Sequence, residues 1–188
     1  SKYDDIHLIL LGRSDLDNQK KEWINSLNKM RAKVEYFAAD VSDLSVLKTV
    51  LSENIIRKTK GIFHIAGVLR DQEISVADWH TFKKALDPKV LGAWNLHMIF
   101  RDRDLDFFVT FGSIASIFSP KSQSSHAGAN AFLDGLAIYR RSIKLPSLNI
   151  QWGPWSEVGA AVQKEVSRDL SSLGVNMMSP DYCLQVLS

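Results

Sequence analysis

Short apolar runs recur along the chain, and each ends at a turn or a polar segment. They cover residues 6–11, 34–38, 61–67, 105–111 and 148–152. Runs of this length without polar alternation are typical of parallel strands that are buried on both faces of a sheet. The pattern therefore predicts a set of parallel strands.

The segments between these runs carry apolar residues at helical spacing. In residues 17–30, for example, Trp23, Ile24, Leu27 and Met30 share one stripe, as in an amphipathic helix. The other predicted helices cover residues 42–56, 76–86, 88–101, 127–141 and 157–173, and a last helix begins at Ser179 and Pro180.

Two of these helix starts have a chemical signature. Ser42 or Asp43 is suited to cap the helix at residues 42–56, because its side-chain oxygen can accept from a first-turn N–H. Pro88 is suited to the first turn of the helix at residues 88–101, where no N–H is needed.

Strands that alternate with helices form a parallel sheet with helices on both faces. We therefore expect an α/β fold of the Rossmann type, a doubly wound parallel sheet, with residues 1–188 in a single domain. Ligands of such sheets bind at the carboxyl ends of the strands. The candidate functional residues that follow predicted strands are Arg13, Asp40, Ala66, Gly67, Ser113, Gly153 and Pro154.

The composition excludes several classes of protein. With 45% hydrophobic and 23% charged residues, the 188-residue chain has the make-up of an ordinary globular domain. A net charge of +2 without a run of basic residues argues against nucleic-acid binding. No apolar run reaches the roughly 18 residues of a membrane-spanning helix, and no signal peptide is evident. We expect no membrane partner and a cytoplasmic location.

Residues that form disulfides or bind metals are few. The only cysteine is Cys183, which excludes an internal disulfide and a cysteine-only metal site. The histidines show no spacing typical of metal ligands, so we expect no metal. They are His7, His64, His80, His97 and His126.

Residues 111–134 carry the densest set of reactive side chains. Ser113 closes the predicted strand before them, and His126 and Asn130 lie four residues apart on one face of the predicted helix. Lys89 lies 24 residues before Ser113.

With these spacings the chain resembles the ketoreductase domains of modular polyketide synthases, a branch of the short-chain dehydrogenase/reductase family. Such domains carry a Lys, a Ser, a Tyr and an Asn. Lys89, Ser113 and Asn130 match three of them. The tyrosine position, thirteen residues after the serine, is occupied by His126.

The resemblance implies a role for each matching residue. Lys89 would hold the nicotinamide ribose and lower the pKa of the proton donor, because a nearby positive charge favours the ionised form. Ser113 would hydrogen-bond the substrate carbonyl. Asn130 would hold a helix distortion and a water chain to the lysine. Without the resemblance, these would be a surface lysine, a strand-end serine and a polar helix residue.

NADPH is the cofactor that the resemblance implies. Arg13, assisted by Ser14, would contact its 2′-phosphate, since a guanidinium suits phosphate oxygens. Asp40 and Val41 would lie beside the adenine. On the simpler interpretation, Arg13 is a solvated turn residue and Asp40 caps a helix.

Two further segments would complete the cofactor site. Ala66 and Gly67 would let the backbone approach the ribose, although any tight turn would also favour a glycine. Pro154 and Trp155, in the run WGPW at residues 152–155, would lie beside the nicotinamide. The predicted helix at residues 157–173 would then be the lid over the substrate.

Asp71 and Phe118 are the candidate substrate-contacting residues. The segment at residues 68–71 resembles the Leu-Asp-Asp segment of B-type ketoreductases, with Asp71 kept and Arg70 in the middle position. Phe118 stands eight residues before His126, where A-type domains carry a tryptophan. The resemblance therefore implies the B-type alcohol as product.

One part of a nucleotide-binding sheet is not found in the sequence. Such sheets usually open with a strand, a glycine-rich turn and a helix, and this chain has no G-x-G-x-x-G. Compared with ketoreductases, it begins at the second strand and lacks the closing strand, so it corresponds to a catalytic half that is incomplete at both ends. We expect a piece of a longer polypeptide, because a sheet without its central first strand has two unpaired edges.

His126 governs the expected activity. Ketone reduction needs a proton at the substrate oxygen, which a tyrosine of lowered pKa can supply. Histidine starts near a pKa of ~6.5, and cationic neighbours would lower it further, leaving a neutral ring and a poor acid. A bridging water would be one way around this difficulty. We therefore expect strongly impaired reduction.

The first functional interpretation is NADPH-dependent reduction of a β-ketoacyl thioester. The substrate would be carried on the phosphopantetheine arm of an acyl carrier protein, with other polyketide synthase domains as neighbours. The alternative is an inactive ketoreductase-like domain with a structural role. A stand-alone short-chain dehydrogenase ranks third.

Overall fold

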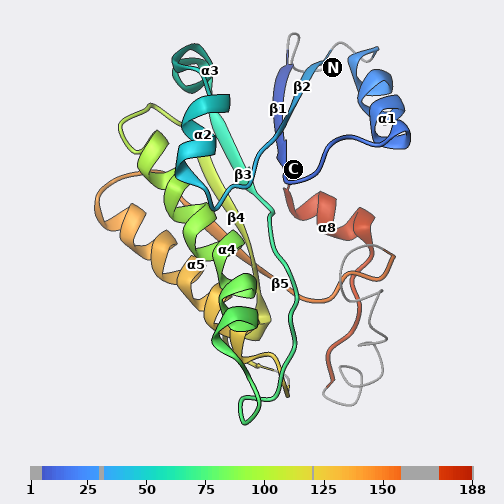
Figure 1. The fold of residues 1–188 in the computed structure, drawn as a ribbon, viewed down its shortest axis with the longest axis vertical. Coiled ribbons are helices and arrows are strands. Elements are labelled where there is room, and N and C mark those ends of the chain that lie inside the picture. The colour runs from blue at the N-terminus through green and yellow to red at the C-terminus, as the bar shows by residue number, and fades with distance from the viewer. Residues whose placement is uncertain (1–5, 30–31, 120, 158–173, 188) are drawn as a thin grey trace.

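The computed structural model describes residues 6–29, 32–119, 121–157 and 174–187. Figure 1 shows strands and helices in alternation along most of the chain. In order, the elements are β1 (Ile6–Gly12), α1 (Asn18–Asn28), β2 (Ala32–Ala38), α2 (Leu44–Val50), α3 (Glu53–Lys58), β3 (Gly61–His64), α4 (Trp79–Phe100), β4 (Phe107–Ser113), the 3-10 helix η1 (Ile114–Ser116), α5 (Ser124–Ser142), β5 (Leu148–Trp152) and α8 (Pro180–Leu187).

All the strand pairs among the described residues are parallel, as the apolar runs predict. They form two sheets: β1 pairs with β2, and β4 lies between β3 and β5. Within the described residues, β1 and β3 each have one edge without a strand partner.

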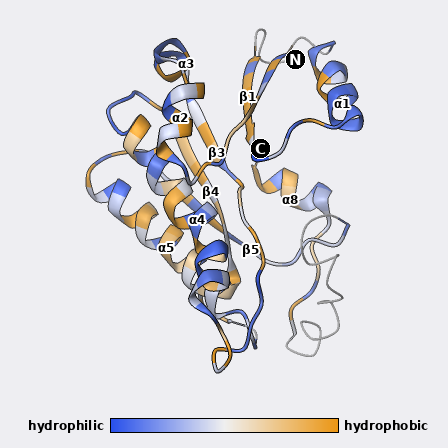
Figure 2. Ribbon diagram, viewed as in Figure 1, coloured by the Kyte–Doolittle hydropathy of each residue, from blue (hydrophilic) through white to orange (hydrophobic). Residues whose placement is uncertain are grey.

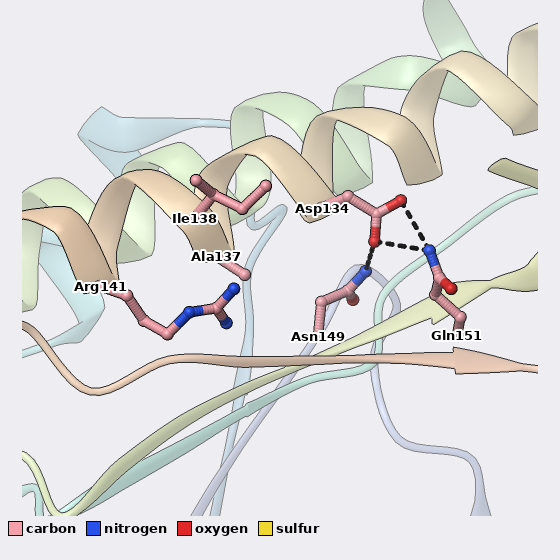
Figure 3. Close-up of a pocket in the computed structure, with 6 residues that line it drawn as sticks. All are labelled: Asp134, Ala137, Ile138, Arg141, Asn149 and Gln151. Atoms are coloured by element: carbon pink, nitrogen blue, oxygen red, sulfur yellow. Dashed lines mark hydrogen bonds between the residues drawn. The ribbon is translucent and has the colours of Figure 1, made fainter. Parts of the chain in front are cut away.

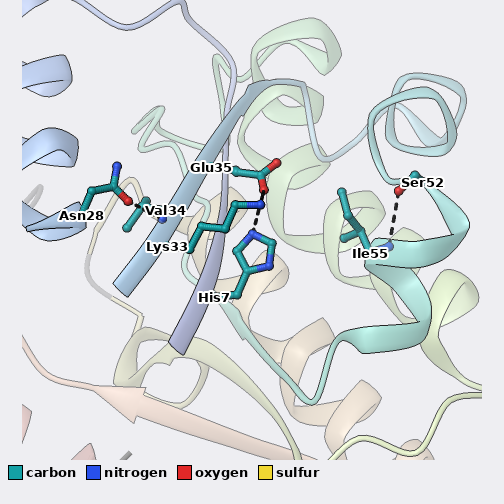
Figure 4. Close-up of polar contacts among 7 residues, drawn as sticks. All are labelled: His7, Asn28, Lys33, Val34, Glu35, Ser52 and Ile55. Carbon is teal, nitrogen blue, oxygen red and sulfur yellow. Dashed lines mark hydrogen bonds and ion pairs between the residues drawn. The ribbon is translucent and has the colours of Figure 1, made fainter. Parts of the chain in front are cut away.

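One boundary prediction is confirmed and another needs correction. Asp43 caps α2, with its carboxylate accepting from the N–H of Ser45 and of Val46. The predicted single helix at residues 42–56 is wrong, because the chain forms two helices, α2 and α3. Ser52 interrupts it and caps α3 by accepting from the Ile55 N–H at 3.3 Å (Figure 4).

The predicted helix start at Pro88 is also wrong. A single helix, α4, runs from Trp79 to Phe100, with Asp78 as its cap and Pro88 inside it. Pro88 lies on the buried face of this helix. Packing of that face therefore outweighs the local preference of proline for a helix start. The predicted helix at residues 157–173 falls almost wholly outside the described residues.

Helices α4 and α5 lie side by side on one face of the three-stranded sheet (Figure 1). Phe108 of β4 and Leu133 of α5 are both fully buried. Leu47 of α2 belongs with Phe108 to the larger core cluster. We call β3, β4, β5, α4 and α5 together the β3–β5 body.

We call β1, α1 and β2 together the β1–β2 unit, and it is less buried. Its strands are coloured as largely hydrophobic in Figure 2, yet Ile6 and Leu8 of β1 are 44% and 40% exposed. Polar contacts support it: Asn28 accepts from the Val34 N–H at 2.7 Å, and Glu35 contacts His7 and Lys33 (Figure 4). Strands of the β3–β5 body also expose apolar residues, Phe63 and Leu148 among them, but that body contains many more buried apolar side chains than this unit.

In the part of the chain that the structure describes, no helix has the length and apolar character needed to cross a membrane.

Candidate active site

Lys89 reaches from α4 to the carboxyl end of β4. Its side chain is buried, and Nζ donates to the Phe111 carbonyl at 2.5 Å. Burial lowers the pKa of Lys89 to about 8. A Cβ placed on Gly67 would lie 3.1 Å from Lys89 Cε, so the glycine permits a close approach here. Lys89 is therefore a buried cation between the ends of β3 and β4, and not the surface lysine of the simpler interpretation.

Ser113 ends β4 and lies opposite Trp152 of β5 in the sheet register. Its Oγ accepts from the Ala115 N–H at 3.2 Å. A serine hydroxyl also has one proton to donate. The residue therefore caps η1 and can still donate to a ligand.

Asn130 and His126 lie on neighbouring turns of α5, and Asn130 is fully buried. Asn130 Nδ2 donates to the His126 carbonyl at 2.7 Å and lies 3.2 Å from His126 Nε2. An amide N–H can only donate, so this contact is a hydrogen bond in the tautomer whose Nε2 carries no proton. Asn130 Oδ1 is buried without a hydrogen-bond partner, which leaves an acceptor for water or a ligand.

Hydrogen bonds join the segment around Asp71 to the start of α5. Gln123 donates to the Asp71 carboxylate at 3.3 Å, and Ser125 Oγ donates to the Arg70 carbonyl at 3.3 Å. A hollow of about 280 Å³ lies between Ile74 on this side and the segment after η1. Phe118, in that second segment, is 74% exposed. The structure thus places both candidate substrate residues in loops near the turn that carries His126.

Asp40 and Val41 follow β2, and both have partners within the protein. Asp40 Oδ1 accepts from the N–H of Ser42 at 2.9 Å and from its hydroxyl at 2.6 Å. Val41 is buried, and its carbonyl accepts from Asn95 Nδ2 of α4 at 3.1 Å. This turn is therefore held directly against the helix that carries Lys89.

Arg13 and Ser14 follow β1 and are exposed. The Ser14 carbonyl accepts from the Tyr36 hydroxyl at 2.5 Å. These two residues belong to the β1–β2 unit, which shares no strand pairing with β3 among the described residues. Of the candidate cofactor residues, Arg13 and Ser14 are therefore the two that no strand pairing connects to the sheet beside Lys89.

Pro154 and Trp155 follow β5, beyond the strand end that faces Ser113. Trp155 packs edge-on against Trp152, with ring centroids 5.2 Å apart. The Pro154 carbonyl accepts from the Met178 N–H at 2.9 Å. The WGPW run is therefore an ordered turn at the same sheet end as Lys89 and Ser113.

A second hollow, of about 300 Å³, lies between α5 and β5 (Figure 3). The Asp134 carboxylate accepts there from the side-chain amides of Asn149 and Gln151 at 2.6 and 3.0 Å. None of the candidate site residues lines this hollow. It is therefore separate from the candidate active site.

Sequence reasoning missed three residues of α4 and β3 that lie at or near the Val41 turn. Asn95 binds the Val41 carbonyl, Gly92 allows Val41 to pack closely, and His64 is buried beside them. The sequence signal for His64 was its place two residues before Ala66, at the end of a predicted strand. Asn95 and Gly92 carried no such signal.

Known proteins resemble this chain over nearly its whole length. The model of the KR domain family matches residues 4–157. One subunit of the phenolphthiocerol/phthiocerol polyketide synthase of Mycobacterium tuberculosis is 30% identical over 182 residues, which cover 96% of this chain and 8% of that subunit. Polyketide synthase GfsE of Streptomyces halstedii is 35% identical over 186 residues, covering 96% of this chain and 5% of the relative. The chain thus spans less than a tenth of either relative.

Solved structures agree with this result. A ketoreductase domain from the bacillaene assembly line superposes with a TM-score of 0.88 at 33% identity, covering 96% of this chain and 46% of that one. A-type ketoreductases from a modular polyketide synthase give 0.89 at 33% identity, covering 96% and 39%. These likenesses confirm the Rossmann-like α/β fold. The chain therefore belongs to the KR domain family, the ketoreductase domains of polyketide synthases.

Proposed function

We propose that this chain is the catalytic part of an NADPH-dependent β-ketoacyl reductase. The observation that carries the proposal is the buried Lys89 ammonium, which binds the Phe111 carbonyl and lies against Gly67. Burial of a cation is unfavourable unless it has partners. A cation kept at the carboxyl ends of parallel strands, where ligands of such sheets bind, supports a binding role.

The residues on this sheet edge fit the nicotinamide half of the cofactor. Lys89 would hold the ribose hydroxyls, with Ala66 and Gly67 beside them and Pro154 and Trp155 near the ring. When bound, the cofactor supplies hydride to the substrate carbonyl carbon. Arg13, Ser14, Asp40 and Val41 would take the adenine end. Since the sequence contains no glycine-rich loop, the pyrophosphate would need amides from another segment.

The chain's own groups would orient the substrate and move its proton. Ser113 Oγ–H would donate to the substrate carbonyl oxygen and stabilise its developing negative charge. Because the pKa of Lys89 is about 8, its amine is largely protonated at neutral pH and can donate. Asp71 and Phe118 would contact the acyl chain, and the B-type alcohol remains our predicted product.

His126 is the residue of this arrangement that is least suited to its role, the donation of a proton to the substrate. Its Nε2 lies 3.2 Å from the Asn130 amide nitrogen, and in the neutral tautomer that accepts from this amide the ring proton is on Nδ1. A neutral imidazole gives up that proton far less readily than an imidazolium. We therefore propose that reduction is strongly impaired relative to a tyrosine-containing site.

The substrate would be a β-ketoacyl thioester on the phosphopantetheine arm of an acyl carrier protein. The relatives are polyketide synthases of which this chain matches a small part, which supports neighbouring synthase domains as partners. A cytoplasmic location is part of the same proposal.

The test is NADPH oxidation with a β-ketoacyl thioester, using the chain extended by a glycine-rich strand, turn and helix. His126→Tyr should raise turnover at least about tenfold, since a positioned acid contributes on the order of 10²–10⁴ in rate. Equal turnover in both proteins would refute the impairment. Ser113→Ala in the tyrosine background is the control and should abolish the gain.

The second candidate is a structural domain without reductase activity. The contact between the Asn130 amide and the His126 ring favours it, because a ring nitrogen engaged by Asn130 is not available to the substrate. In that case the extended chain binds no NADPH, and His126→Tyr produces no turnover.

A further inference from the structure

Helix α4 carries large apolar side chains on its exposed side as well as on its buried side. Leu91, Trp94 and Met98 are 39%, 39% and 38% exposed. They lie three or four residues apart, so they form one stripe along the helix. Ala93 and Leu96, between them in sequence, are buried. A helix with one face in the core normally turns a polar face to solvent, so this second apolar stripe indicates a surface that a partner covers.

Helix α5 continues this apolar surface. The Tyr139 ring lies beside that of Trp94, with centroids 6.2 Å apart, and Tyr139 is 45% exposed. Tyr139 belongs to a stripe on α5, at positions 128, 131, 135, 139 and 142, that has no charged residue. Gly128 and Gly135 of this stripe are exposed, and a Cβ on either would meet nothing within 4 Å among the described residues. Glycines in a helix interior weaken the helix, and here they leave room for another helix to approach closely. We define the α4–α5 face as the surface formed by Leu91, Trp94, Met98, Gly128, Gly135 and Tyr139.

Charges of opposite sign stand at the two ends of the α4 stripe. Asp87 lies seven residues before Trp94, and Arg101 lies seven residues after it. Seven residues are close to two helical turns, so both charges lie on the same side of the helix as Trp94, each about 10 Å away along the axis. Asp87 is paired with Lys83 at 2.5 Å, and Arg101 with Asp102 at 3.5 Å. Because solvated pairs such as these contribute little to stability, both charges can change partners at little cost.

A second copy of α4, related to the first by a two-fold axis through Trp94, runs antiparallel to it. In this arrangement Asp87 of each copy lies at the level of Arg101 of the other copy, and the apolar residues between these charges meet. The contact is then complementary in charge at both ends and apolar in its centre. A two-fold interface requires such self-complementarity, because the same surface serves both partners.

We propose that the α4–α5 face binds a second copy of this chain, with the two α4 helices antiparallel and Trp94 at the two-fold axis. The glycines of α5 allow the apolar side chains of the second copy to approach the backbone. This inference concerns assembly and does not depend on the proposed reaction.

Charge reversal at the two ends of the stripe tests the arrangement. Analytical ultracentrifugation of the chain over a range of concentrations measures its self-association. Asp87→Arg and Arg101→Asp should each raise the Kd of the dimer at least about tenfold, because each places like charges opposite one another twice in the interface. The double variant with both changes restores opposite charges and should return Kd to near the parent value. Lys33→Asp is the matched control, because it reverses an exposed charge of the β1–β2 unit, and it should leave Kd unchanged.

Trp94→Ala tests the centre of the interface. A tryptophan enclosed at the centre of an interface is often among the residues that contribute most to binding, so we expect Kd to rise about thirtyfold or more. Circular dichroism and the melting temperature check that the variant is folded. The charge variants change solvated side chains, so they report on the interface even if Trp94→Ala loses stability.

Sedimentation of the parent chain as a monomer at every concentration would overturn the proposal. A dimer that keeps its Kd in Trp94→Ala would also overturn it, since the contact would then lie elsewhere. If both single charge variants weaken the dimer and the double variant does not recover, the antiparallel arrangement is wrong. None of these measurements involves NADPH, so a failure of the proposed reductase function would leave their outcome unchanged.

Discussion

The β3–β5 body and the β1–β2 unit are built from the same kind of parallel strand, yet they differ in burial. Leu133 in the body is completely buried, whereas Ile24 and Val34, the buried apolar residues of the unit, keep 8% and 7% exposure. The body also holds Lys89, Ser113, His126 and Asn130, the candidate catalytic residues. The unit carries Arg13 and Ser14, on the proposed adenine side.

This difference follows from strand pairing. Two helices cover the body, while β1 has one partner strand and an open edge among the described residues. We infer that the catalytic groups rest on a self-supporting core, and that the β1–β2 unit depends more on what covers its edge.

The largest expected effect is a difference in unfolding free energy between core mutations in the β3–β5 body and in the β1–β2 unit. Leu133→Ala should destabilise the chain by about 3–5 kcal/mol and Ile24→Ala by about 2 kcal/mol, because a residue enclosed on all sides leaves a larger cavity. The two deletions remove similar volumes, so the comparison is matched. Urea denaturation measures both. Equal losses would show that the two halves have equally tight cores.

A second prediction uses the acid sensitivity of the body. The pKa of His64 is lowered to about 4, below the ordinary value of ~6.5 expected in the unfolded chain. The stability that comes from keeping this ring neutral is therefore complete above ~6.5 and is lost as the pH falls towards 4. The shift corresponds to about 3 kcal/mol.

Urea denaturation across this pH range should show that loss in the parent chain. His97, whose pKa is also lowered by burial, adds in the same direction. In His64→Asn the loss should be clearly smaller. A variant with the parent's full pH dependence would contradict the assignment to His64.

The smallest effect is expected at the surface of the β1–β2 unit. Glu35→Gln removes the partner of His7 and Lys33, but these groups are solvated and the pair is screened by salt. We expect no measurable change in the denaturation midpoint at about 0.15 M salt. A clear loss would mean that surface charge contributes substantially to holding this unit together.

Local pattern predicted much of the fold. The apolar runs located all five strands of the described residues, and Asp43 was one of the two predicted caps, because such a side chain acts on adjacent N–H groups. Lys89, Ser113 and Asn130 were singled out by the resemblance to ketoreductase domains, which match them in type and spacing along the chain.

The tertiary structure decided what depends on distant partners. Pro88 lies within α4 because its buried face packs on the sheet, and local preference did not show this. Asn95 of α4 meets the Val41 carbonyl only after folding, so no local pattern marked it. The sequence by itself determined strand and helix types, caps and the spacing of reactive side chains, because these depend on near neighbours. Burial of Lys89 and the division of the strands into two sheets depend on long-range contacts, and only the folded chain could settle them.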